Sequence, residues 1–370
     1  MLFRSKHGFF NQPFNLILTT ETPGAIILFT TDGSEPGISG GVTNGTLYSS
    51  PINISKTTAL RAAGFGPNLL PTLVASQTYL FVEDIVHQPN NPAGYPTGNV
   101  WTPTPAIIQN GSRAYYQMDP AIVNDPQYTN AVRAGLTSIP TMSVILPIPD
   151  LFDPNNGIYT HPQSRSVGWE RACSMELIYP DGSAGAQINS GLQIQGGTQR
   201  DPAKNAKHSF RVNFKGDYGA GKFDFPMYAG SPVQSFNTFV LDGGINYWWH
   251  YAGGSVPADQ RYRAQCVRDQ FTSDLMLALG HPSFHGQFYN LYLNGLYWGL
   301  HYVHERPDDD FAASYLGGNN TDYDVIKNTT FGTEIVAGDL TAWNAALALA
   351  NMGLTNNTQY EQLQIGRAHV

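Results

Sequence analysis

Short β-rich runs separated by Gly, Pro and Asn fill the first eighty residues, and no part of this stretch has the periodicity of a helix. The runs include residues 14–20, 25–31 and 76–81. The second run ends at Asp32-Gly33, which is a strong turn signal. Short strands at this spacing are typical of a β-sandwich, because each turn reverses the chain and lets neighbouring strands pair. We therefore predict an immunoglobulin-like all-β domain over residues 1–82.

The composition narrows the class of protein. Of 370 residues, 41% are hydrophobic and 12% are aromatic, which supplies enough apolar side chains for packed domains and argues against intrinsic disorder. The 28 acidic residues outnumber the 20 basic ones, which argues against nucleic-acid binding because that function needs a basic surface. No run approaches the ~18–20 apolar residues of a membrane span. The low charged fraction, 13%, leads us to expect a secreted or cell-surface protein, although residues 1–10 do not resemble a signal peptide.

The cysteines and the last residues also carry information. Cys173 and Cys266 are too few for a disulfide framework or a zinc site, and we expect two ordinary thiols rather than a single bridge. The end of the chain, residues 365–370, corresponds to the translation of a common sequencing adapter. We therefore expect these six residues to be an artefact, and the natural sequence to continue beyond Gln364.

The chain changes character after the first domain. Residues 83–138 are rich in Pro, Asn and Gly, and we predict an ordered connector that crosses the surface of the next domain. From residue 139 to 364, strand and helix patterns alternate, which indicates an α+β domain. Asn294-Gly295 is the strongest short signal for a hairpin. The predicted strands are 140–146, 173–179, 191–196, 208–214 and the two arms of the hairpin 288–303, and the predicted helices are 126–136, 265–279 and 339–350.

Residues 191–215 carry the most informative chemical pattern. A strand leads into Gly196 and Gly197, and a second strand follows with Lys207 at its start and Arg211 inside it. Glycines between two strands let backbone N–H groups approach a phosphate. The cations can neutralise the phosphate, Lys as a compact charge and Arg through two parallel hydrogen bonds. The alternative from the residues alone is a hairpin with exposed cations and no ligand.

The order of the elements gives this pattern a context. A glycine turn, a cationic strand, a helix, a hairpin and then residues 305–308 follow one another, as in the amino-terminal lobe of a protein kinase. Such a lobe needs an acid on the helix to hold the strand Lys, and Asp269 or Asp274 could supply it. The signature strings of ordinary protein kinases around the strand Lys, the catalytic loop and the metal-binding Asp are absent, so this is not an ordinary protein kinase.

Two parts of the chain resemble known families. Thr30-Thr31-Asp32-Gly33-Ser34-Glu35-Pro36 resembles the core of the module named after the C-terminal domain of chitobiase and β-hexosaminidase, a non-catalytic β-sandwich, and the resemblance covers about residues 5–81. Residues 139–364 resemble the spore-coat-protein-H (CotH) kinases, which are atypical protein kinases. The matching strings include Trp169-Glu170-Arg171, Gly196-Gly197-Thr198-Gln199-Arg200, residues 207–215, residues 291–300 and Glu305-Arg306-Pro307-Asp308.

The CotH resemblance implies a function and a set of site residues. It implies that ATP with Mg²⁺ or Mn²⁺ phosphorylates Ser or Thr of a partner protein at a bacterial surface or spore coat. Arg200 and Lys207 would bind the phosphates, with Arg211 as a lesser possibility. Asp269 would position the lysine, and Glu305 would begin the segment near the adenine or the interlobe hinge. The implied nucleotide-binding residues are Gly196, Gly197, Arg200, Lys207, Arg211, Asp269 and Glu305.

The resemblance also indicates what this stretch lacks. The catalytic Asp and the metal-binding Asp of such kinases are expected beyond Gln364, so we assign neither here and expect residues 1–370 alone to be inactive. Asp339 begins an Asp-x-x-x-x-Asn string, but an N-cap explains it better. The alternative function is a non-enzymatic surface or carbohydrate-binding protein. In that protein the kinase scaffold would be degenerate, and the β-sandwich would contact glycan or wall material.

Overall fold

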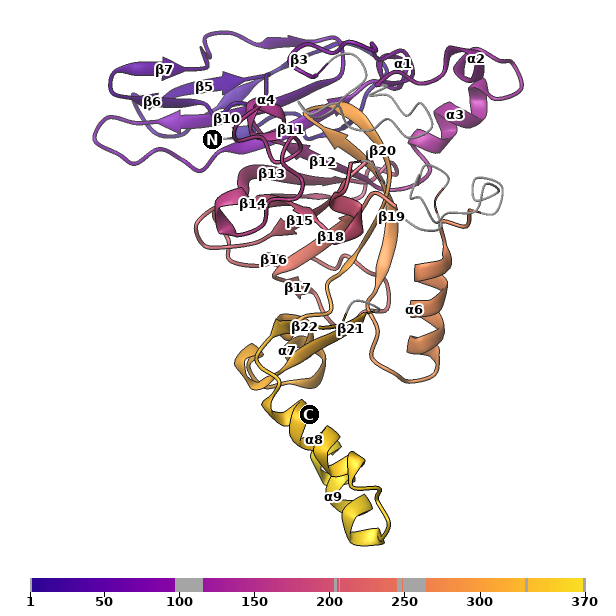
Figure 1. Cartoon of the computed structure of the whole chain (residues 1–370). Helices are drawn as coiled ribbons and strands as arrows, with labels where there is room; N and C mark the ends of the chain where they lie inside the picture. Colours follow the sequence, from indigo (N-terminus) through magenta and orange to yellow (C-terminus); the bar gives the residue numbers. More distant parts are fainter. Residues whose placement is uncertain are drawn as a thin grey trace.

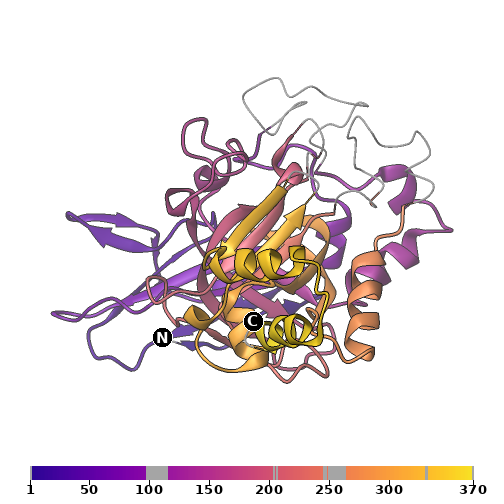
Figure 2. The same cartoon turned by 60° about the horizontal axis from the view of Figure 1, so that its bottom comes forward.

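The computed structural model describes residues 2–96, 116–202, 205, 207–244, 248, 264–329 and 332–368. It has the predicted α+β architecture. In Figure 1 the N-terminal β-domain lies against one end of a β-barrel, and the C-terminal helices extend from the other end. Figure 2 brings that second end forward, with α8 and α9 in front of the barrel. None of the helices in the described ranges is long and apolar enough to span a membrane.

The N-terminal domain is all-β, as predicted. A five-stranded sheet has the order β2-β11-β10-β5-β8, and β3 pairs with β9 beside it. Leu16 and Ile54 of the β3–β9 pair share one core with Leu60 and Tyr79 of the larger sheet, so the domain has two layers. The strands are β1 (Leu2–Phe3), β2 (Gly8–Phe9), β3 (Phe14–Leu16), β4 (Leu18–Thr19), β5 (Ile26–Thr30), β6 (Gly37–Ser39), β7 (Val42–Asn44), β8 (Thr46–Leu47), β9 (Ile52–Ile54), β10 (Thr58–Phe65) and β11 (Ala75–Leu80).

The second domain is built on a closed barrel with the strand order β12-β13-β14-β15-β18-β20-β19. Its interior holds a large apolar core that includes Met142, Leu177, Phe210 and Leu291, all fully buried. Asn294 and Gly295 both have positive φ, 50° and 81°, as a two-residue hairpin turn requires, so the predicted hairpin is confirmed. The strands are β12 (Thr141–Ile145), β13 (Arg171–Ile178), β14 (Ala186–Gln195), β15 (Ser209–Asn213), β16 (Phe223–Asp224), β17 (Ser235–Phe236), β18 (Thr238–Asp242), β19 (Gly286–Leu293), β20 (Leu296–Glu305), β21 (Val325–Thr329) and β22 (Gly332–Ala337).

Helices lie beside the barrel and at the end of it that is opposite the N-terminal domain. The connector is ordered in its described parts, and the Tyr95 hydroxyl donates to the carbonyl of Leu293 on the hairpin at 2.8 Å. The Asp339 carboxylate accepts the Thr341 N–H at 2.7 Å, but the N-cap of α8 is Leu340, so Asp339 lies one residue before the predicted capping position. The helices are α1 (Val82–Val86), α2 (Pro120–Val123), α3 (Thr129–Leu136), α4 (Ile148–Phe152), α6 (Arg268–Ala278), α7 (Asp309–Leu316), α8 (Thr341–Asn351) and α9 (Asn357–Ala368).

The predicted helix over residues 265–279 is present as α6, and most of its apolar side chains are exposed. In the structure Val267, Phe271 and Leu275 are 59%, 67% and 49% exposed, and the buried residue of the helix is Ser273. Ser273 faces inward because its hydroxyl donates to the Phe284 carbonyl and contacts Ser283. A polar contact therefore determines which face of α6 meets the barrel.

The two domains are joined through a buried carboxylate. Glu176 on β13 is fully buried and accepts a hydrogen bond from Thr78 on β11, while its other oxygen lies 3.0 Å from His7 Nδ1. Thr78 also contacts Ser143 at 2.8 Å. A buried carboxylate needs hydrogen-bond partners. The N-terminal domain supplies two of them to Glu176 of the barrel, the Thr78 hydroxyl and the His7 ring.

Candidate nucleotide-binding site

A cavity of about 1030 Å³ opens where the glycine turn meets the barrel wall. Strands β14, β15, β18 and β20 form one side of it, and the β21–β22 hairpin contributes the other. Its lining combines apolar, aromatic and charged side chains. A cavity of this size accommodates a ligand as large as a nucleoside triphosphate.

Cations are concentrated in this cavity. Arg165, Arg211, Arg306 and Lys327 all line it, against the carboxylates of Asp242 and Glu334. Burial, reinforced by the nearby charge of Arg306, lowers the pKa of Arg211. The Arg211 Nε is buried and has no hydrogen-bond partner in the part of the chain that the structure describes. A terminal nitrogen of Arg211 donates to Gln193 Oε1. Like charges in one cavity repel, and a bound anion would relieve this repulsion.

The glycine turn borders the cavity. Gly196 and Gly197 both line it. Gly196 has φ +108°, a backbone conformation that residues other than glycine rarely adopt, so a substitution here would be strained. Nothing lies within 4 Å of a Cβ built on Gly197. The turn therefore presents bare backbone to the cavity, which is what close approach to a phosphate needs.

Arg200 lines the cavity, but its guanidinium has a different set of partners from those expected. Nε donates to the Gly196 carbonyl at 2.7 Å, one terminal nitrogen donates to the Pro162 and Ser164 carbonyls at 2.8 and 2.9 Å, and the other donates to the Ile194 carbonyl. Burial, together with the charges of Arg165 and Arg211, lowers its pKa to about 10. The planar guanidinium thus ties the glycine turn to the 162–166 loop.

Lys207 is not among the residues that line this cavity. Its ammonium donates to the Leu300 carbonyl at 2.8 Å and lies 6.0 Å from the centre of the Trp248 ring. Burial lowers the pKa of Lys207 to about 7, and the Asp242 carboxylate opposes this effect. Among the described residues no ion pair joins Lys207 to Asp269. The structure thus brings Asp242, not Asp269, into electrostatic contact with the lysine.

Asp269 lies in the first turn of α6. Burial raises its pKa, and the Asp242 carboxylate raises it further, while His304 lowers it. It is not a lining residue of the cavity, whereas Asp242 and His304 are.

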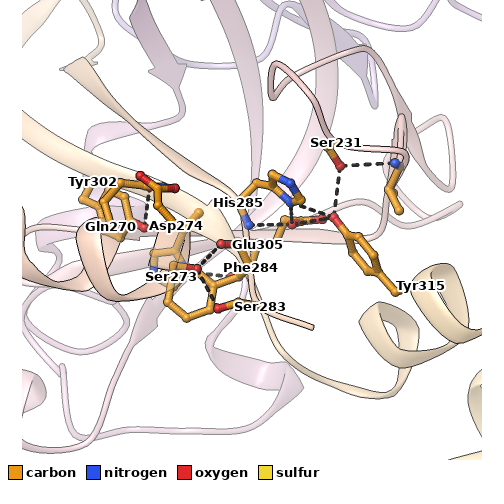
Figure 3. A network of polar contacts seen from close by, with 12 residues as sticks. Ser231, Gln270, Ser273, Asp274, Ser283, Phe284, His285, Tyr302, Glu305 and Tyr315 are labelled. Carbon is orange, nitrogen blue, oxygen red and sulfur yellow. Dashed lines mark hydrogen bonds and ion pairs between the residues drawn. The ribbon is translucent and has the colours of Figure 1, made fainter. Parts of the chain in front are cut away.

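Glu305 points away from the cavity. Its carboxylate accepts hydrogen bonds from the His285 backbone N–H and from the Tyr315 hydroxyl (Figure 3). The following residues, Arg306 and Pro307, are the ones that reach the cavity. Within the Glu305-Arg306-Pro307-Asp308 string, the cation that lines the cavity is therefore Arg306.

Sequence reasoning missed five charged side chains that line the cavity: Arg165, Asp242, Arg306, Lys327 and Glu334. A signal existed for Asp242, which ends a buried strand and is followed by Gly243-Gly244. Arg165 lies in an irregular loop, and no local pattern distinguishes it from other loop arginines.

The described residues form no protein-only metal site. No group of three or more His, Cys, Asp or Glu side chains that could hold a metal ion lies in the described ranges. Asp242 Oδ1 accepts from Gln199 Nε2, Ser209 Oγ and Gly244 N at 3.1, 2.8 and 2.8 Å, so this oxygen is already used. Mg²⁺ in kinases is held by one or two carboxylates with substrate phosphates. A divalent ion here would therefore depend on a bound triphosphate for most of its ligands.

Comparison with family models agrees with both resemblances. Residues 5–76 match the chitobiase/β-hexosaminidase C-terminal domain, and residues 257–365 match the CotH kinase protein. The chain therefore has one segment similar to each of these two families, in that order. The CotH match includes α6, the β19–β20 hairpin with Arg306, and the β21–β22 hairpin across the cavity. No curated protein matches the chain.

Proposed function

We propose that this cavity binds ATP and that the chain forms the nucleotide-binding part of an atypical CotH-type Ser/Thr protein kinase. The observation that carries the proposal is the cluster of Arg165, Arg211 and Arg306 in one cavity beside a glycine turn. The arginines that line the cavity outnumber its carboxylates, so the cavity is suited to the negative charge of a triphosphate. Each guanidinium can bind a phosphate through two N–H groups. The CotH match over residues 257–365 supports the kinase class.

The rest of the cavity fits the other parts of a nucleotide. Ile194, Val240, Ile326 and Val336 give it apolar surface suited to a base, and the bare backbone of the glycine turn lies beside the cations. We propose that Arg211 and Arg306 bind the phosphates, and that Arg200 acts indirectly by fixing the turn. A bound divalent ion would neutralise phosphate charge, and Asp242 is the barrel carboxylate that lines the cavity.

The remaining functional assignments are also proposals. Lys207 and Asp269 would support the cavity wall from behind rather than contact the phosphates. The acceptor would be a Ser or Thr side chain of a partner protein, and the location would be the cell surface. Both domain types are consistent with such a location. We assign no catalytic carboxylate within residues 1–364.

Calorimetric titration with ATP, ADP, AMP and adenosine in the presence of Mg²⁺ tests the proposal. Affinity is expected to rise with the number of phosphates, and Arg211→Gln is expected to weaken ATP binding about tenfold, the effect of losing one charge-assisted contact of ~1.4 kcal/mol. Arg133→Gln is the matched control, because Arg133 pairs with the exposed Glu83 on α1, away from the cavity. Equal affinity for adenosine and ATP would refute phosphate recognition. Binding of an oligosaccharide without any nucleotide binding would favour the non-enzymatic alternative.

A further inference from the structure

A polar cluster surrounds the buried carboxylate of Glu305 where β20 ends (Figure 3). The Tyr315 hydroxyl lies 2.9 Å from both carboxylate oxygens of Glu305, 2.9 Å from His285 Nδ1 and 3.0 Å from Ser231 Oγ. The His285 backbone N–H donates to Glu305 Oε2 at 2.8 Å. Glu305 is 3% exposed, so its charge is satisfied by these partners and not by bulk water.

The cluster joins elements that are distant in sequence. Glu305 is the last residue of β20, Tyr315 belongs to α7, His285 precedes β19, and Ser231 lies in the loop before β17. The His285 ring also stacks against the rings of Tyr315 and Tyr228, with centroids 6.0 and 6.3 Å apart. One hydroxyl therefore connects α7 to the barrel wall.

Arg306 lies between the end of β20 and the start of α7, the two elements that this cluster joins. It directly follows Glu305 in the chain, and its Nε lies 3.6 Å from Asp308 Oδ2. Asp308 in turn caps α7, because its Oδ1 accepts the Phe311 N–H at 3.1 Å. The segment with the cavity cation is thus anchored on one side by Glu305 and on the other by α7, and Tyr315 links these two anchors.

We propose that Tyr315 is a positioning residue for anion binding, acting through Arg306 although it does not line the cavity itself. The Tyr315–Glu305 contact closes the ten-residue stretch from the end of β20 to α7 and holds the Arg306 side chain in the cavity. A variant without the hydroxyl would keep the apolar packing of the ring but would lose the hydrogen bond between Tyr315 and Glu305. This inference rests on the proposed function for the identity of the anion, although the positioning role itself needs only an anion.

A double-mutant cycle tests the inference on residues 1–370. The variants are Tyr315→Phe, Arg306→Gln and the double variant, and the probes are ATP with Mg²⁺ and inorganic tripolyphosphate. Tyr323→Phe is the matched control, since its hydroxyl donates to the carbonyl of Gly317, the C-cap of α7, and not to Glu305. Tyr315→Phe is expected to raise the Kd for both probes about fivefold, which is about 1 kcal/mol. In the Arg306→Gln background the same change should have no effect, and Tyr323→Phe should leave Kd unchanged.

The outcomes separate the two proposals. Two results would overturn the inference. In the first, the double variant raises Kd by the full product of the two single-variant factors, which means that Tyr315 acts independently of Arg306. In the second, Tyr315→Phe leaves Kd unchanged. If tripolyphosphate shows the coupling but ATP does not bind, the nucleotide proposal fails and the positioning role stands. If neither probe binds the wild-type chain, both fail. Should Tyr315→Phe not fold, Glu305→Gln replaces it and should show the same dependence on Arg306.

Discussion

Replacing Arg200 distinguishes a guanidinium that holds the turn from one that binds phosphate. The side chain is 8% exposed and donates to four backbone carbonyls, of Gly196, Pro162, Ser164 and Ile194. A hydrogen bond to a charged group contributes about 1.5–3 kcal/mol, but four bonds that share one side chain do not add fully. We therefore expect Arg200→Met to lower the free energy of unfolding by about 3–4 kcal/mol, a large part of a typical total of ~5–15 kcal/mol.

The conservative variant is the more informative one. Arg200→Lys keeps the positive charge but cannot present a planar fork to four carbonyls, so we expect it to lose about 2–3 kcal/mol as well. Guanidinium chloride unfolding followed by tryptophan fluorescence gives the stabilities, and ATP titration gives the affinities. Arg133→Met is the control, since an exposed ion pair contributes less than about 1 kcal/mol.

Two results would refute this account of Arg200. If the free energy of unfolding of Arg200→Lys lies within about 0.5 kcal/mol of the wild-type value, the hydrogen bonds to the four carbonyls do not stabilise the turn. If Arg200→Lys is stable and retains ATP affinity while Arg200→Met is stable and loses it, the residue acts on phosphate through its charge, as the sequence had suggested.

Three further predictions concern the domain contact, the buried lysine and phosphate transfer. Gly33→Ala should destabilise the chain by about 2–4 kcal/mol, because its Cβ would lie 2.3 Å from the Leu146 carbonyl, whereas Gly40→Ala, also at positive φ but in open space, should cost about 1 kcal/mol; equal unfolding midpoints would contradict this. Burial lowers the pKa of Lys207 to about 7 from 10.5, so between these values the unfolded chain binds a proton that the folded chain does not. Stability should therefore rise with pH across that window, and an equal rise in Lys207→Met, measured by urea unfolding, would be evidence against the assignment. Residues 1–370 should bind ATP without transferring its terminal phosphate, since we assign no catalytic carboxylate; label on Ser or Thr that is lost in Asp242→Asn would place the catalytic acid in the cavity.

Local patterns in the sequence predicted the elements well. The all-β first domain and the Asn294-Gly295 hairpin depend on turn chemistry and on period-two patterns, which are properties of neighbouring residues. The closed barrel was not predicted, because closure depends on β12 pairing with β19, two strands far apart in the sequence. The orientation of α6 was not predicted, because the partners of its buried residue Ser273 lie beyond the helix.

The sequence indicated residues around the glycine turn, and the structure adds where each of them lies. Gly196, Gly197 and Arg211 line the cavity, whereas Lys207, Asp269 and Glu305 do not. Which cations face the ligand depends on side-chain direction: Arg200 turns back to four carbonyls, and Glu305 turns into the Tyr315 cluster. The cavity also needs Arg165 and Lys327, which come from distant loops and hairpins. Such convergence is a property of the folded chain and has no local sequence signal.

The most direct test of the central claim is a crystal structure of this chain with a non-hydrolysable ATP analogue and Mg²⁺. The account predicts the triphosphate between the glycine turn at Gly196-Gly197 and the guanidinium groups of Arg211 and Arg306, within hydrogen-bond distance of both. It also predicts that the Arg200 guanidinium keeps its carbonyl partners in the complex. An analogue bound elsewhere, or a cavity that stays free of it at saturating concentration, would contradict the claim that this arginine-lined cavity is the nucleotide site.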